Sequence, residues 1–94
     1  MADSFAVTER TRMRRKAKRA TYDRATIYAI LDEALIASVA AVIDGKPELQ
    51  PMIHVRIGDP IILHGVAGNR MLRGIARGAE VCLNVTHLDA LALA

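Results

Sequence analysis

The clearest pattern along the chain is an alternation of residue types between Leu49 and Ile57. Side chains two residues apart lie on the same face of a β-strand, so this segment is predicted to be a strand with two different faces. One face carries the apolar residues, which are Leu49, Ile53, Val55 and Ile57. The other face carries Gln50, Met52, His54 and Arg56, and we expect it to meet a ligand or water.

Turn residues divide the surrounding sequence into further strands. The run from Ile36 to Ile43 is of β-type, and Asp44-Gly45-Lys46-Pro47 then favours a hairpin into the alternating strand. Gly58-Asp59-Pro60 turns the chain into a strand from Ile61 to His64, and a last strand is predicted from Glu80 to Thr86. The pattern therefore predicts four strands.

Two helices accompany these strands. Asp23 is a candidate N-cap for a helix that extends to about Ala34. Its apolar residues have helical spacing and are expected to pack in the core; they are Ile27, Ile30, Leu31 and Ala34. A second, shorter helix follows a glycine-bearing turn after His64, and this helix carries Asn69 and Arg70 at its start.

The start of the second helix is a candidate anion site. The first N–H groups of a helix have no partner within it, and the helix dipole places partial positive charge at the same end. A phosphate group suits such a position, and an arginine there can pair with two of its oxygens. Arg73 and Arg77 share a helix face with Arg70, and from spacing alone this stripe is interpreted as a solvated surface.

Several antiparallel strands with a short helix before the last one favour a small barrel or a strongly curved sheet, so the expected class is mainly β with short helices. Ninety-four residues make one small domain that a partner subunit would stabilise, and we expect a dimer. The segment from Leu88 to Ala94 begins as a further strand, which suggests a truncated chain with an unpaired edge.

Positive charge is concentrated in residues 1–20, which we interpret as a separate N-terminal arm. Its basic residues are Arg10, Arg12, Arg14, Arg15, Lys16, Lys18 and Arg19, and acidic residues outnumber basic ones in the rest of the chain. Such runs are usually solvated and flexible. Nucleic acid or an anionic surface is the alternative partner, but no aromatic residue stands among the basic ones to stack on bases.

Composition sets the expected location. There is one cysteine, Cys82, at an alternating strand position, where a small buried hydrophobic role is expected rather than a nucleophilic one. The sequence contains no apolar run of the roughly 20 residues that cross a bilayer and no signal-peptide pattern at its start. We therefore expect a cytoplasmic protein without membrane contact.

Several kinds of chemistry find no support in the motifs. The three histidines, His54, His64 and His87, do not have metal-ligand spacing, so no metal site is expected. No nucleophile elbow, phosphate-binding loop of nucleoside triphosphatases or dinucleotide fingerprint is present. Hydrolytic and nucleoside-triphosphate chemistry are therefore not predicted.

An ordered set of short motifs nevertheless resembles one family over residues 21–94. The motifs are Tyr22-Asp23-Arg24-Ala25-Thr26-Ile27, Asp44-Gly45-Lys46-Pro47, Gln50-Pro51-Met52-Ile53-His54-Val55-Arg56, Leu63-His64-Gly65, Gly68-Asn69-Arg70-Met71-Leu72 and Val81-Cys82-Leu83-Asn84-Val85-Thr86. Together they are similar to the pyridoxamine 5′-phosphate oxidase-like flavin-nucleotide-binding proteins. The order and spacing of the motifs carry this resemblance.

The resemblance implies an FMN-binding split β-barrel, incomplete in this chain, that acts as a flavin-dependent oxidoreductase. It also implies a homodimer with flavin at the subunit interface. Matched position by position, the residues implied in FMN binding are Gln50, Met52, His54, Leu63, His64, Asn69 and Arg70. His64 is the one candidate for a catalytic proton donor, because an imidazole can exchange a proton near neutral pH.

One departure from the family pattern bears on the substrate. Pyridoxamine 5′-phosphate oxidase itself has a basic residue directly after the matching arginine, whereas this chain has Met71. Vitamin B6 oxidation is therefore less favoured than a general flavin-dependent role, and the substrate stays open. The alternative function is a non-enzymatic truncated barrel module that could bind nucleic acid through the basic arm.

Overall fold

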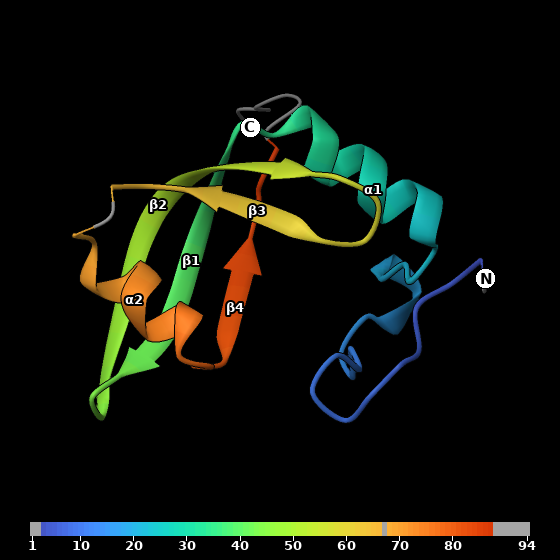
Figure 1. The fold of residues 1–94 in the computed structure, drawn as a ribbon. Coiled ribbons are helices and arrows are strands. Elements are labelled where there is room, and N and C mark those ends of the chain that lie inside the picture. Colours follow the sequence, from blue (N-terminus) through green and yellow to red (C-terminus); the bar gives the residue numbers. More distant parts are fainter. Residues whose placement is uncertain (1–2, 67, 88–94) are drawn as a thin grey trace, which may run out of the picture.

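The computed structural model describes residues 3–66 and 68–87, and these form one antiparallel sheet with short helices (Figure 1). In chain order the elements are the 3₁₀ helix η1 (Ala17–Arg19), α1 (Arg24–Glu33), β1 (Ile36–Ile43), β2 (Lys46–Arg56), β3 (Ile61–His64), α2 (Arg70–Ala76) and β4 (Val81–Asn84). The predicted elements are confirmed, with β2 longer and β4 shorter than expected. The strand expected from Leu88 lies outside the described residues.

The four strands pair in the order β3-β2-β1-β4, and each neighbouring pair is antiparallel. The β1–β2 hairpin closes through Asp44 and Gly45, whose φ angles of 52° and 77° are left-handed, as a two-residue type I′ turn requires. Across the described residues the sheet does not close on itself. This arrangement confirms the predicted class, an incomplete split barrel.

Helix α1 begins where the sequence predicts, because the Asp23 side chain accepts a hydrogen bond from the Thr26 N–H at 2.9 Å. The expected burial of its apolar stripe is wrong. No residue of α1 is buried, and Ile30 is 38% exposed. The reason is its position, since α1 lies beside the end of β2 instead of across the centre of the sheet (Figure 1).

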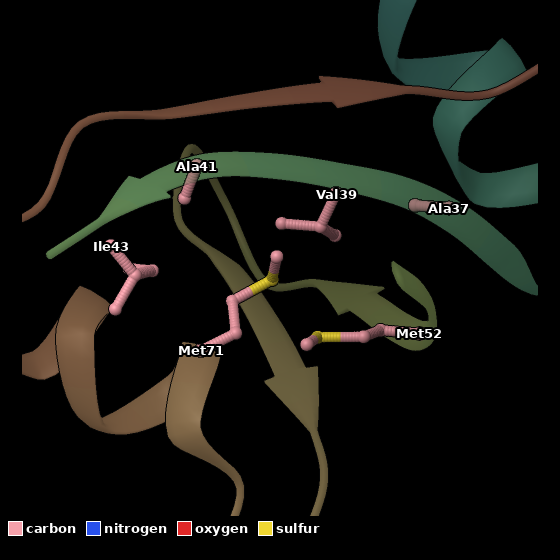
Figure 2. Close-up of a cluster of buried hydrophobic side chains, with 6 residues drawn as sticks. All are labelled: Ala37, Val39, Ala41, Ile43, Met52 and Met71. Atoms are coloured by element: carbon pink, nitrogen blue, oxygen red, sulfur yellow. The ribbon is translucent and has the colours of Figure 1, made fainter. Parts of the chain in front are cut away.

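The core lies between α2 and one face of the sheet, here called the inner face. Figure 2 shows Met71 of α2 directed towards side chains from β1 and β2. The buried cluster consists of Ala37, Val39, Ala41, Ile43, Met52 and Met71. Small side chains on β1 leave room for the long thioether of Met71, which is fully buried.

The alternation predicted for β2 is confirmed, but the expected assignment of its faces is wrong. Met52 and His54, expected to meet a ligand or water, are each only 5% exposed on the inner face. Leu49 and Val55, on the apolar face, are 69% and 53% exposed. The cause is that α2 and the end of α1 cover the inner face, which the strand's own sequence does not encode.

The opposite face of the sheet, here called the outer face, is apolar and exposed. Its large side chains are Ile36, Val42, Leu49, Ile53, Val55 and Ile62. Register aligns them across strands, since Ile36 pairs with Ile53 and Val55 pairs with Ile62. Cys82 pairs with Ala40 and is exposed, so its predicted burial is wrong. Exposed apolar residues aligned in this way are typical of an interaction site.

The segment before α1 folds back against the helix start. The Phe5 N–H donates to the Tyr22 carbonyl at 2.8 Å, and the Arg24 N–H donates to the Asp3 carbonyl at 2.8 Å. The Tyr22 hydroxyl also donates to the Thr11 carbonyl. These bonds hold the N-terminal segment near the start of α1.

Candidate functional site

The junction between β3 and α2 is held by the side chain of Asn69. Its Oδ1 accepts a hydrogen bond from the Leu72 N–H at 3.0 Å, so Asn69 is the N-cap of α2. Its Nδ2 donates to Gln50 Oε1 at 3.1 Å, which ties the helix start to β2. Two of the predicted site residues are therefore in direct contact. The Leu72 N–H, one of the groups at the helix start that we expected to bind an anion, therefore already has a partner.

Arg70 follows the cap and turns towards β2. Its Nη2 lies 2.7 Å from Glu48 Oε2, and the arginine side chain stays 54% exposed while that of Glu48 is 20% exposed. Oε2 is buried and accepts no hydrogen bond from the described residues, so the contact with Arg70 is an ion pair. Glu48 therefore offsets the charge of Arg70 without saturating its donors.

Arg70 is also one of three arginines around a cavity of about 340 Å³. The cavity lies between α2 and the β1–β2 hairpin, and we call it the arginine pocket. Its lining consists of Arg70, Arg73 and Arg77, with Asp44 and an apolar floor of Ile43, Gly74 and Ala79. The helix packs closely against β1 here, since a Cβ added at Gly74 would lie 2.4 Å from Ile43 Cδ1.

Met52 and His54 are buried on the inner face of the sheet. Met52 packs in the core, and His54 Nε2 lies 2.9 Å from the Leu31 carbonyl oxygen. The backbone N–H of His54 donates to the Leu35 carbonyl at 3.2 Å. His54 Nδ1 is buried and has no hydrogen-bond partner among residues 3–66 and 68–87. Both side chains thus face protein and help to fix β2 against the helices.

Leu63 and His64 are neighbours on β3 and lie on opposite faces of the sheet. Leu63 is half-buried and packs against the core on the inner face, opposite His54 in the register. His64 is exposed and pairs with Ile53, which places it on the outer face. The predicted residues therefore divide between two faces, with Gln50, Asn69 and Arg70 on one side and His64 on the other.

Sequence reasoning did not identify Glu48 as part of this region. Glu48 precedes Gln50 by two residues, so it lies on the same face of β2, and that spacing was the available signal. The sequence did not show that the Arg70 side chain points towards β2, because this depends on how α2 packs against the sheet. Arg73 and Arg77 were interpreted as a surface stripe, whereas the fold places the hairpin opposite them.

A second polar cluster fastens α1 to the end of β2. Arg56 donates to both carboxylate oxygens of Asp32, at 2.9 and 2.7 Å, and its guanidinium lies 3.9 Å from the centre of the Tyr28 ring. These hydrogen bonds from Arg56 lower the pKa of Asp32. The Tyr28 hydroxyl donates to Asp59, and this bond raises the pKa of Tyr28. The cluster is a structural tie between the helix, the strand and the β2–β3 turn.

Comparison with known proteins identifies the family. The family model for pyridoxamine 5′-phosphate oxidase matches residues 23–94, and the chain belongs to this family. The resemblance predicted from the short motifs is therefore confirmed. Searches of curated proteins and of solved structures give no match.

Within the described ranges, none of the helices has the length and apolar character that crossing a bilayer requires. The same ranges contain no group of three or more histidine, cysteine, aspartate or glutamate residues that could hold a metal ion.

Proposed function

We propose that this chain binds FMN and takes part in flavin-dependent oxidation and reduction. The observation that carries the proposal is the family match over residues 23–94, together with the exposed guanidinium of Arg70 directly after the β3–α2 junction. An arginine fork pairs well with the oxygens of a phosphate ester. The proposal does not include a particular substrate or electron donor.

The residues around the β3–α2 junction fit the phosphate end of FMN. The side chain of Arg70 is 54% exposed, and its ion pair with Glu48 leaves donors available. The amide of Asn69 is held by Gln50 and by the cap, so it would orient the junction more than bind directly. In this proposal His64 lies along the flavin from the outer face, while Leu63, Met52 and His54 support β2 and β3 from the inner face.

When bound, the flavin supplies the electron or hydride transfer, and the protein supplies anchorage, orientation and shielding from water. His64 is the proposed residue for holding or releasing a proton, because its imidazole is exposed on the outer face. A His64→Ala variant is expected to slow flavin reduction or reoxidation. Unchanged rates for both steps would remove His64 from the proposal.

We propose a homodimer that associates through the outer face, with flavin at the subunit interface. The six large apolar side chains of that face support this proposal, since aligned exposed apolar residues favour association. No charged residue of the described strands lies among them on that face. A second copy would cover the surface symmetrically.

Absorbance from 350 to 500 nm, with and without added FMN, tests the cofactor, and a native mass measured on the same sample tests the assembly. A protein that already holds flavin is yellow. A protein that binds added FMN quenches the fluorescence of that FMN. Arg70→Ala is expected to weaken binding by about tenfold or more, because charge-assisted hydrogen bonds contribute about 1.5–3 kcal/mol. A colourless protein that leaves FMN fluorescence unchanged would contradict the proposal.

The alternative is a non-enzymatic module that binds nucleic acid through the N-terminal arm. Its support is a set of exposed basic residues that form no ion pair among residues 3–66 and 68–87, namely Arg12, Arg15, Lys16, Lys18 and Arg19. Such binding falls steeply as salt rises, since each phosphate contact releases counterions. Retention of an oligonucleotide that disappears on deletion of residues 1–20, in a protein indifferent to FMN, would favour this function.

A further inference from the structure

We propose that the arginine pocket binds the phosphate group of a small molecule, with Arg73 and Arg77 as its principal ligands. This inference goes beyond the proposed flavin site, because it assigns a role to two arginines at the other end of α2 from the Asn69–Arg70 pair, namely Arg73 in the last turn and Arg77 at the C-cap. It does not depend on flavin being the molecule that carries the phosphate. Four observations support it.

The first observation is that the two guanidiniums have no partner among residues 3–66 and 68–87. Arg70 is paired with Glu48, whereas Arg73 and Arg77 form no ion pair or side-chain hydrogen bond with any residue that the structure describes. Each guanidinium carries five N–H donors and no acceptor. Both arginines line the same cavity, so an anion bound there could accept hydrogen bonds from both.

The second observation is the spacing of the two arginines. Arg73 lies in the last turn of α2 and Arg77 is its C-cap, four residues later, so the two side chains leave the same side of the helix end. Like charges at this spacing repel each other and destabilise a helix slightly. A phosphate between them would replace this repulsion with two charge-assisted interactions, which gives the pair an energetic reason to bind an anion.

The third observation is the charge of the surrounding side chains. Asp44 is the carboxylate in the lining, and the structure places it in no ion pair with the described arginines. Glu48 faces Arg70 from β2. Three guanidiniums therefore meet two carboxylates, and the local charge is positive. Asp44 is the carboxylate that would compete with a bound phosphate for the arginines, because it lines the same cavity.

The fourth observation is size. The cavity of about 340 Å³ is at the lower end of the range of about 300–1,000 Å³ for small-molecule sites. It is bounded below by Ile43 and Gly74, whose close packing fixes the helix against the hairpin. A pocket of this size, lined by apolar residues and three arginines, suits a compact anion rather than a polymer, which would need an extended groove.

The test is a titration of the full chain with inorganic phosphate and with pyrophosphate at constant ionic strength, followed by NMR of the arginine Nε–H signals. We expect saturable shifts at Arg73 and Arg77. An Arg73→Gln/Arg77→Gln variant is expected to lose at least tenfold in affinity. The matched control, Arg12→Gln/Arg15→Gln, removes the same charge from the arm and should change affinity by less than twofold.

Two additional variants separate the pocket from general charge effects. Asp44→Asn is expected to tighten phosphate binding about two- to fivefold, because it removes the competing carboxylate while keeping a similar shape. Arg73→Lys/Arg77→Lys keeps the charge but not the planar fork, and it should recover part of the affinity lost in the glutamine variant. Backbone amide spectra of each variant establish that the fold is retained.

The source of the phosphate is distinguished by comparing FMN with riboflavin, which lacks the phosphate. Shifts at Arg73 and Arg77 with FMN but not with riboflavin would identify the flavin as the molecule bound there. Shifts with inorganic phosphate but not with FMN would assign the pocket to another small phosphorylated molecule. Phosphate binding without any FMN binding would support the pocket while contradicting the flavin proposal.

The proposal is overturned if neither phosphate nor pyrophosphate moves the Arg73 and Arg77 signals at constant ionic strength. It is also overturned if the arm variant loses as much affinity as the pocket variant, since that result indicates diffuse attraction by net charge. Because the first of these outcomes is measured on the unmodified chain, it does not depend on any variant being able to fold.

Discussion

Arg70 and Glu48 form an ion pair that joins α2 to β2, with 2.7 Å between Nη2 and Oε2. The arginine expected to bind phosphate is thus already next to a carboxylate, and that carboxylate is mostly buried. Any anion that binds Arg70 must compete with Glu48. In the proposed site the pair would therefore lower the affinity for an anion and fix the position of the Arg70 guanidinium.

Glu48→Gln is expected to tighten FMN binding about two- to fivefold, because a partly exposed ion pair is worth up to about 1 kcal/mol. The measurement is a titration of FMN fluorescence. Glu33→Gln removes one negative charge from an exposed position on α1 and is the control for net charge. Weaker binding in the Glu48 variant would show instead that Glu48 holds Arg70 in a competent position.

Leu49→Lys is expected to shift the protein from dimer to monomer, because it places a charge on the exposed outer face. Leu49 is 69% exposed in the single chain, so the substitution need not disturb the core. Val7→Lys makes the same change at an exposed apolar residue outside that face. Sedimentation equilibrium measures the mass, and an unchanged mass for Leu49→Lys would place the subunit contact elsewhere.

Gly74→Ala is expected to lower the free energy of unfolding by about 1 kcal/mol. The new Cβ would lie 2.4 Å from Ile43 Cδ1, and overpacking costs about 1–3 kcal/mol, while the better helix propensity of alanine offsets about 1 kcal/mol. Urea denaturation measures the change. Gly68→Ala is the matched control, since its added Cβ would meet no atom within 4 Å.

The Ile43→Val substitution removes the Cδ1 atom that a Cβ at position 74 would meet. The double variant Ile43→Val/Gly74→Ala should therefore be more stable than the sum of the two single effects predicts. Strictly additive effects would mean that α2 moves away from β1 instead of pressing on Ile43.

Asp32→Asn is expected to make stability less sensitive to acid. Hydrogen bonds from Arg56 lower the pKa of Asp32 in the folded protein, so the unfolded chain binds the proton more readily. The stabilisation is present above the ordinary carboxyl pKa of about 3.9 and is lost as the pH falls through the lower folded value. Urea midpoints between about pH 7 and pH 2 should converge for the two proteins at the acid end. Parallel curves would show that Asp32 contributes nothing.

The local signals in the sequence were sufficient to locate the secondary structure. Asp23 and Asn69 are both N-caps, and Asp44-Gly45 makes the expected tight turn. Each of these features depends on a few adjacent residues, since capping and turn geometry are set within about four positions. The family resemblance added the fold class, an incomplete split barrel.

Contacts between distant elements could not be predicted in the same way. Alternation in β2 is visible in the sequence, but which of its faces is buried depends on where α2 packs. Because α2 covers the inner face, Met52 and His54 are buried. The pairing of Arg70 with Glu48 depends on the same docking. A polar residue on a strand therefore indicates a ligand only after the covering helix is known.

Cys82 is the one cysteine in the sequence, and it is exposed on the outer face opposite Ala40. A thiol-reactive dye would therefore label a single, known position on the sheet. The rate of labelling and the emission of the attached dye would report, in solution and in real time, whether that surface is occupied. The molecule thus contains its own attachment point for a reporter of assembly, without any engineered residue.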